Sequence, residues 1–141
     1  MRFLAKFERK VEINSSPKKI YDILNDENLE EKWNITVKKL TTIEPDKYSV
    51  KTTVGDIIST IIERDDNKKI TMEIEGGPFS KMGYVLTPKG DSTEVMGWAE
   101  FEDPEQESIL GMAGDMLLES LKKYADYLEG GGNPAEYNKK K

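Results

Sequence analysis

The stretch VEINSSPKKIYDIL, residues 11–24, changes its hydrophobic period at its midpoint. Up to Ile13 the apolar side chains alternate, as in a strand with one buried face. After Pro17 they recur three and four residues apart, as in a short amphipathic helix. The two serines before this proline offer a hydroxyl that caps a helix, and proline has the fixed φ angle suited to the first helical position. The chain therefore begins with a long strand, predicted from Phe3 onward, that turns directly into a helix.

A second short helix is predicted from about Asn28, with Leu29 and Trp33 on one face. Short strands separated by turn sequences such as EPDK, DDNK and PKGDS follow, near residues 35–44, 48–54, 57–64, 70–74, 79–86 and 93–102. The spacing then becomes helical over residues 104–128, and three glycines end the helix. This order predicts an α+β domain, with a curved antiparallel sheet of about seven strands and one long helix packed on it. The polar segment 131–141 is expected to be a disordered tail.

The composition excludes several classes of protein. A chain of 141 residues is expected to form one domain. It contains no cysteine and no histidine, which excludes disulfide scaffolds, thiolate metal sites and Ser-His-Asp or Cys-His hydrolases. The net charge of −6 argues against binding to a nucleic-acid backbone. Without a run of about 20 apolar residues or a signal-like segment, a cytoplasmic protein is expected. The many Lys and Glu residues lean toward a thermophilic source.

The order of elements resembles the helix-grip fold of the Bet v 1-like START/SRPBCC superfamily, in particular its polyketide cyclase/dehydrase-like members. Four segments carry the resemblance: VEINSSPKKIYDILND (11–26), LEEKWN (29–34), GDSTEVMGWAEFE (90–102) and LLESLKKYADYLEG (117–130). It covers residues 1–130, which are therefore expected to form the domain. The resemblance implies a sheet that grips the long helix and leaves a cavity between them. In that superfamily the cavity holds lipids, sterols, polyketides or other hydrophobic molecules, or serves as an active site.

The candidate cavity residues are large aromatic or flexible apolar side chains, together with one helix glycine. They are Trp33, Tyr48, Met72, Tyr84, Trp98, Met112, Gly114 and Met116. Each of the aromatic and methionine side chains is equally suited to ordinary core packing. Gly111 and Gly114 lie inside the long helix, where each costs up to about 1 kcal/mol relative to alanine. They either bend the helix or make room for a ligand, or allow close contact with the sheet, or precede a helix that starts only after Gly114.

Arg9 falls on the inward face of the first strand, among apolar neighbours. The favoured interpretation is that the end of the strand is already exposed to water at this point, or that a bulge reverses the alternation. The alternative is that Arg9 pairs with a ligand carboxylate or with an internal acid such as Glu63 or Glu73.

These observations support three hypotheses about function. The first is binding or transport of a hydrophobic small molecule, such as a lipid, a polyketide or an isoprenoid-like compound, in the cavity. The second is an enzyme of the polyketide cyclase/dehydratase type that uses the same cavity, although no acidic pair has the spacing of a catalytic dyad. The third is a protein-interaction module, such as an accessory protein for a chaperone or a redox enzyme. No metal, cofactor or nucleic-acid partner is expected, and the sequence leaves both a monomer and a homodimer open.

Overall fold

The computed structural model describes residues 4–141, so the predicted first strand residue, Phe3, lies outside the described residues. Seven antiparallel strands form one sheet in the order β1-β7-β6-β5-β4-β3-β2. The strands are β1 (Ala5–Ile13), β2 (Val37–Glu44), β3 (Lys47–Thr52), β4 (Gly55–Asp65), β5 (Lys69–Glu75), β6 (Phe79–Lys89) and β7 (Ser92–Phe101). The helices are α1 (Pro17–Leu24), α2 (Glu30–Trp33) and α3 (Glu107–Glu129), with 3-10 turns η1 (Glu27–Leu29), η2 (Pro104–Gln106) and η3 (Pro134–Glu136).

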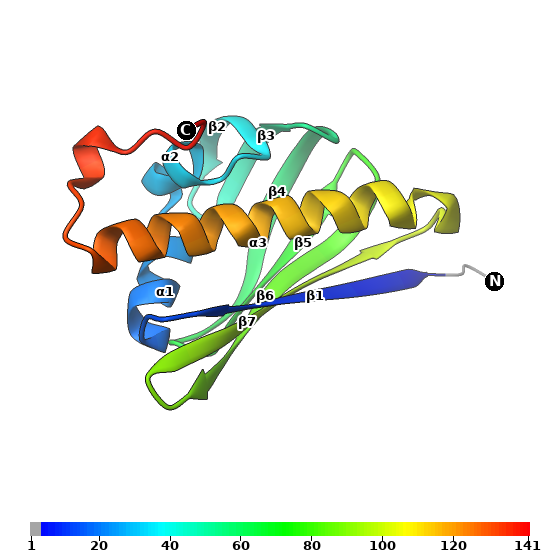
Figure 1. Ribbon diagram of the computed structural model, residues 1–141. Helices are drawn as coiled ribbons and strands as arrows, with labels where there is room; N and C mark the ends of the chain where they lie inside the picture. The colour runs from blue at the N-terminus through cyan, green and yellow to red at the C-terminus, as the bar shows by residue number, and fades with distance from the viewer. Residues whose placement is uncertain (1–3) are drawn as a thin grey trace.

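The sheet curves around α3, which crosses its concave face, while α1 and α2 lie at one end of the molecule (Figure 1). This is the helix-grip architecture that the sequence predicts. Helix α3 packs most closely along β1, at the edge of the sheet, and to a smaller extent on β7. The close approach to β7 occurs at Gly97, where an added Cβ would lie 3.5 Å from Leu118 Cδ2. The strands farther from β1 do not pack closely on α3, which leaves space between them and the helix.

The switch from strand to helix after β1 follows the sequence prediction. Ser16 caps α1 by accepting a hydrogen bond from the Lys19 amide (3.2 Å), and Pro17 occupies the first helical position. Just before the helix, the main-chain oxygen of Ser15 accepts a hydrogen bond from the buried hydroxyl of Thr93 in β7 (2.7 Å). The turn from β1 into α1 is thereby attached to the neighbouring strand, which fixes the direction in which α1 leaves the sheet.

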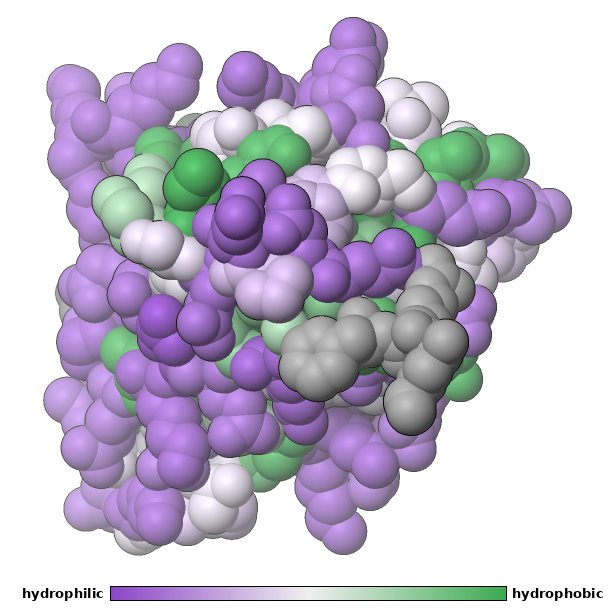
Figure 2. Space-filling view, turned by 90° about the vertical axis from the view of Figure 1, so that its right-hand side faces the viewer, coloured by the Kyte–Doolittle hydropathy of each residue, from purple (hydrophilic) through white to green (hydrophobic). Residues whose placement is uncertain are grey.

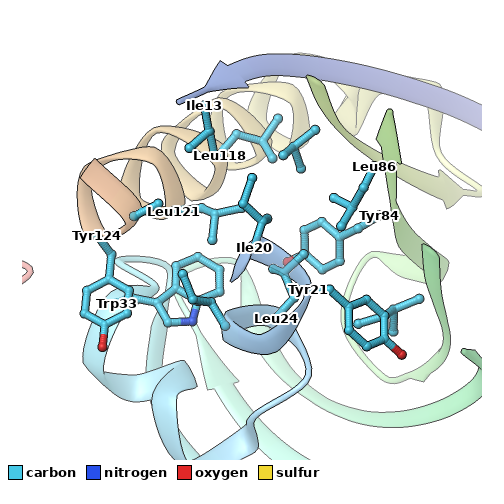
Figure 3. Close-up of a cluster of buried hydrophobic side chains, with 14 residues drawn as sticks. Ile13, Ile20, Tyr21, Leu24, Trp33, Tyr84, Leu86, Leu118, Leu121 and Tyr124 are labelled. Carbon is cyan, nitrogen blue, oxygen red and sulfur yellow. The ribbon is translucent and has the colours of Figure 1, made fainter. Parts of the chain in front are cut away.

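The main hydrophobic core joins both short helices to the sheet and to the second half of α3. Figure 3 shows Ile20 and Leu24 of α1 beside Leu118 and Leu121 of α3, with Trp33 near Tyr124. Burial of such side chains stabilises the fold by roughly 1.5–3 kcal/mol each. Several members of this core, such as Leu24, Ile70 and Leu118, also form one wall of the cavity described below. The first half of α3 lies over a different part of the sheet, where the interior is not filled.

The segment 131–141, which the sequence analysis expects to be disordered, packs back across α2. The ring of Tyr137 lies against two rings of α3, those of Tyr124 and Tyr127. The Lys139 ammonium donates hydrogen bonds to the main-chain oxygens of Asn34 (3.0 Å) and Val37 (2.7 Å). These two oxygens lie in the connection from α2 to the start of β2, where the Asn34 oxygen also accepts a hydrogen bond from the Val37 amide (3.1 Å). The segment therefore covers the end of α2 and holds it in place.

Candidate functional site

A cavity lies between the concave face of the sheet and the first half of α3. Its volume is about 140 Å³. An apolar cavity of about 150 Å³ in another protein is large enough to bind benzene. Most of the wall is apolar: Phe7, Leu24, Val37, Leu40, Val50, Val54, Ile57, Ile61, Ile70, Met72, Phe79, Met82, Leu110, Leu117 and Leu118. Such a wall favours a ligand with a hydrophobic body.

Simple periodicity brings these residues to the cavity. In each strand every second side chain points to the concave face, as Ile70 and Met72 do in β5. In α3 the lining residues recur three and four positions apart, namely Leu110, Ala113, Gly114, Leu117 and Leu118. Because Ala113 and Gly114 are small, the helix leaves free space opposite the middle of the sheet.

Polar groups collect at the α2 end of the cavity, and the half-buried Glu30 is one of them. Its carboxylate accepts a hydrogen bond from the Asn34 side-chain amide (3.2 Å), and both residues line the cavity. Burial raises the pKa of Glu30 from its ordinary 4.5 to about 7, against the opposing effects of Asn34 and the Lys139 ammonium. Glu30 therefore takes up and releases a proton near neutral pH at the polar end of the cavity.

Tyr84 of β6 faces the same end of the cavity. Burial, and then the nearby Glu30 carboxylate, raise the pKa of Tyr84 well above its ordinary value, so its hydroxyl keeps its proton. Among the described residues no group accepts a hydrogen bond from this hydroxyl. Tyr48 of β3 differs, because its hydroxyl donates a hydrogen bond to Glu27 Oε2 (3.4 Å). The cavity thus contains one tyrosine with a free donor and one whose donor is already used.

Arg9 borders the opposite end of the cavity, and its guanidinium interacts with α3. Nε lies 3.4 Å from Asp115 Oδ1, and Nη1 donates a hydrogen bond to the main-chain oxygen of Glu8 (3.1 Å). Exposure to water, the favoured interpretation, agrees with the structure, because the Arg9 side chain is 37% exposed. The alternative partners Glu63 and Glu73 were wrong, because Asp115 of α3 lies beside the guanidinium instead.

Gly111 and Gly114 allow α3 to approach Arg9 and Phe7 of β1 closely. A Cβ added at Gly111 would collide with the Arg9 guanidinium, and one added at Gly114 would lie 3.0 Å from Phe7 Cε2. Of the explanations left open by the sequence, a helix that starts after Gly114 is wrong, because α3 begins at Glu107. Close contact with the sheet accounts for Gly111. Gly114 has both properties, since it contacts Phe7 and also lines the cavity.

Comparison with known proteins identifies the family. Residues 5–129 match the model of the family described as polyketide cyclase / dehydrase and lipid transport. The chain belongs to this family. A search of curated proteins finds no relative with significant sequence similarity.

Solved structures agree on the fold. A START superfamily protein from Mycobacterium smegmatis is 18% identical, with a TM-score of 0.78 over 87% of this chain and 98% of its own. The di-domain ARO/CYC StfQ from the steffimycin biosynthetic pathway is 13% identical, with a TM-score of 0.73 over 90% of this chain and 52% of its own. The Aha1 dimer from Colwellia psychrerythraea is 17% identical, with a TM-score of 0.67 over 84% and 93%. At these identities the likeness concerns the fold alone.

Four of the eight candidate residues predicted from the sequence line the cavity. They are Tyr48, Met72, Tyr84 and Gly114. Trp98 borders the cavity, but its ring lies on the outer face of the sheet. There it covers Gly83, whose added Cβ would lie 2.9 Å from the ring, and the Lys6 ammonium lies 5.0 Å from the ring centroid. Strand alternation places Lys6 opposite to the buried Phe7, and therefore outside.

The other three candidates do not line the cavity. Trp33 is fully buried in the core beside Tyr124, and its indole N–H has no hydrogen-bond partner among the described residues. Met112 and Met116 are 64% and 49% exposed on the outer side of α3. These assignments fail because α3 carries apolar residues around much of its circumference, so that spacing alone does not single out the inner face.

The sequence did not predict Glu30, the cavity carboxyl group whose pKa is raised to about 7. It stands in LEEKW, where two adjacent glutamates resemble the exposed acids of a first helical turn. The only available signal is the position of Trp33, which is buried and lies three residues after Glu30, so that the two share a face of α2. Glu31, on the other side of the same helix, is exposed.

Residues 4–141 contain neither a cluster of metal-binding side chains nor a helix that could span a membrane. No group of three or more carboxylates lies close enough to hold a metal ion. No helix in this range is long and apolar enough to cross a membrane. At the end of the molecule where α3 begins, hydrophilic side chains dominate the surface and hydrophobic ones form separate islands (Figure 2). The cavity is therefore the strongest candidate for a functional site in the described part of the chain.

Proposed function

We propose that this protein binds an apolar small molecule in the cavity under the first half of α3. The observation that carries the proposal is an apolar cavity of about 140 Å³ in a single folded domain, with its few polar groups gathered at one end. An unfilled space of this size lowers stability by roughly 3 kcal/mol, at about 24 cal/mol per Å³ of cavity, and an apolar ligand that fills it would restore the lost contacts. The family description, which includes lipid transport, supports the same function.

Native mass spectrometry of the protein as purified tests this proposal. We expect a species heavier than the chain by the mass of one small molecule, which denaturation releases into an organic extract. Because apolar burial supplies the affinity, the released compound should partition into the organic phase. A protein that is empty as purified, and that also fails to take up naphthalene or 2-naphthol, would contradict the proposal.

An enzyme acting in the same cavity is the second candidate, and Glu30 is the observation that favours it. A carboxyl whose pKa lies at about 7 is suited to take up and release a proton at neutral pH, and Tyr84 lies on the same cavity wall. The two candidates are separated by analysis of the compound after incubation with the protein. A binding protein returns it unchanged, whereas an enzyme returns a product whose formation is lost in Glu30→Gln.

A further inference from the structure

The polar groups at the α2 end of the cavity leave two hydrogen-bonding positions open. Tyr84 extends from β6 toward Ile20 and Leu24 of α1 (Figure 3), and among the described residues nothing accepts its hydroxyl proton. The Glu30 carboxylate receives one hydrogen bond, from Asn34 to Oε2, which leaves its other oxygen available. Buried polar groups are stable only when paired, and each unpaired one costs roughly 1–3 kcal/mol. Neither the Tyr84 hydroxyl nor the Glu30 carboxylate is among the fully buried atoms without a partner in the described residues, so solvent can reach them, and a ligand that displaces this solvent must supply hydrogen bonds in its place.

The charges around Glu30 restrict the kind of ligand. Within the described residues no lysine or arginine forms an ion pair with Glu30. The ammonium of Lys139 is held by two main-chain oxygens instead. Glu27, which also lines the cavity, adds a second carboxylate. The one cationic side chain on the wall, Arg9, lies at the opposite end beside Asp115. A ligand carboxylate placed here would therefore meet the like charge of Glu30, while the nearby Lys139 ammonium already donates to two main-chain oxygens.

A hydroxyl group satisfies both open positions. Its oxygen accepts the proton of Tyr84, and its own proton is donated to the Glu30 carboxylate. When Glu30 is protonated, the same oxygen accepts from the carboxyl group instead. A carboxylate has no proton to donate, an ammonium group has no acceptor for Tyr84, and a pure hydrocarbon leaves both positions unpaired.

We infer that the ligand is an apolar alcohol or phenol, with its single hydroxyl group between Glu30 and Tyr84 and its hydrophobic body along Met72 and the first half of α3. This inference rests on the proposed function, since it specifies the chemistry of the molecule that the cavity binds. It goes beyond that function by excluding ligands whose head group is a carboxylate, such as free fatty acids, from this orientation.

Calorimetric titration at pH 8 with naphthalene and three derivatives tests the inference. The derivatives carry a hydroxyl, a carboxylate or an aminomethyl group on the same ring system. We expect 2-naphthol to bind at least about tenfold more tightly than naphthalene, because it pairs two buried polar groups. Naphthalene-2-carboxylate is expected to bind more weakly than naphthalene. 2-Naphthylmethylammonium should bind less tightly than 2-naphthol, because it offers Tyr84 no acceptor.

Three variants assign the effect to named side chains. Tyr84→Phe should reduce the advantage of 2-naphthol over naphthalene to less than about threefold, while naphthalene itself binds as before. Glu30→Gln should remove the discrimination against the carboxylate. Glu31→Gln is the matched control, since Glu31 is the exposed neighbour on the same helix, and it should retain the wild-type order.

The pH dependence provides an independent readout. The groups that face Glu30 are Asn34 of α2, Tyr84 of β6 and Lys139 of the C-terminal segment, and the pKa of Glu30 among them is about 7. Below that pH Glu30 is neutral, so the wild-type protein should bind the naphthoate more tightly as the pH falls from 8 to 6. Glu30→Gln should not show this change.

The outcomes separate the inference from the proposed function. Equal affinities for all four compounds, or tightest binding of the ammonium compound, would overturn the assignment of a hydroxyl ligand and leave the cavity as a binding site. If neither naphthalene nor 2-naphthol binds and the purified protein is empty, the proposed function itself fails, and the inference fails with it.

Discussion

Replacing Glu30 by glutamine is expected to stabilise the folded protein by roughly 3 kcal/mol at pH 8 and to have little effect at pH 4. The reason is the pKa of Glu30, which burial raises from 4.5 to about 7 in the folded state. Between these two values the folded state holds a proton that the unfolded state has released. The free energy of unfolding of the wild-type protein therefore falls as the pH rises from about 4.5 to about 7. Glutamine does not ionise, and its side-chain oxygen still accepts the hydrogen bond from Asn34.

Urea unfolding at a series of pH values measures this difference. The wild-type and variant curves should converge at low pH and separate progressively up to about pH 7, the pKa of Glu30. Glu31→Gln, at the exposed neighbouring position, should follow the wild-type curve. A constant difference between Glu30→Gln and the wild type across the whole pH range would mean that folding does not raise the pKa of Glu30.

The second large effect is expected from Ala113→Leu, which adds three carbon atoms to the inner face of α3 where it lines the cavity. The affinity for 2-naphthol should fall at least about tenfold, or about 1.4 kcal/mol, because the added side chain occupies the space of the ligand. The free energy of unfolding should stay within about 1 kcal/mol of the wild type, since filling a cavity offsets the strain of a larger side chain.

The matched control is Met112→Leu, which introduces the same residue one position away, on the exposed side of α3. It should bind 2-naphthol as the wild-type protein does. If Ala113→Leu retains full affinity while it unfolds at the wild-type urea concentration, the ligand does not occupy the space beneath α3.

The fold was accessible from the sequence because its elements have unambiguous local signals. Alternation in β1 and the Ser16-Pro17 start of α1 specify both the strand and the point where it ends. The turns are equally well marked, as at Asn67, whose positive φ angle of 63° suits asparagine in the tight turn after β4. Local backbone preference and hydrophobic period agree at each of these positions, so the order of elements follows directly.

The site was predicted less completely, because it depends on contacts between elements that are distant in sequence. The phase of α3 decides that Ala113 lies inside and Met112 outside, and this phase is set by packing against β1 rather than by the composition of the helix. Glu30 acquires its altered pKa only when α2 is enclosed by the sheet and by the C-terminal segment. That segment looks disordered from its polar composition, yet Tyr137 attaches it to α3.

The distribution of methionines permits the most direct test of the account. Met72 and Met82 line the cavity, whereas Met112 and Met116 lie exposed on the outer side of α3. With the methionine methyl groups labelled with carbon-13, a titration with 2-naphthol can be followed by NMR at all four positions in one sample. The account predicts saturable shifts of the Met72 and Met82 methyl signals, with those of Met112 and Met116 unchanged. Shifts confined to Met112 and Met116 would place the ligand on the outside of the helix and contradict a binding cavity beneath it.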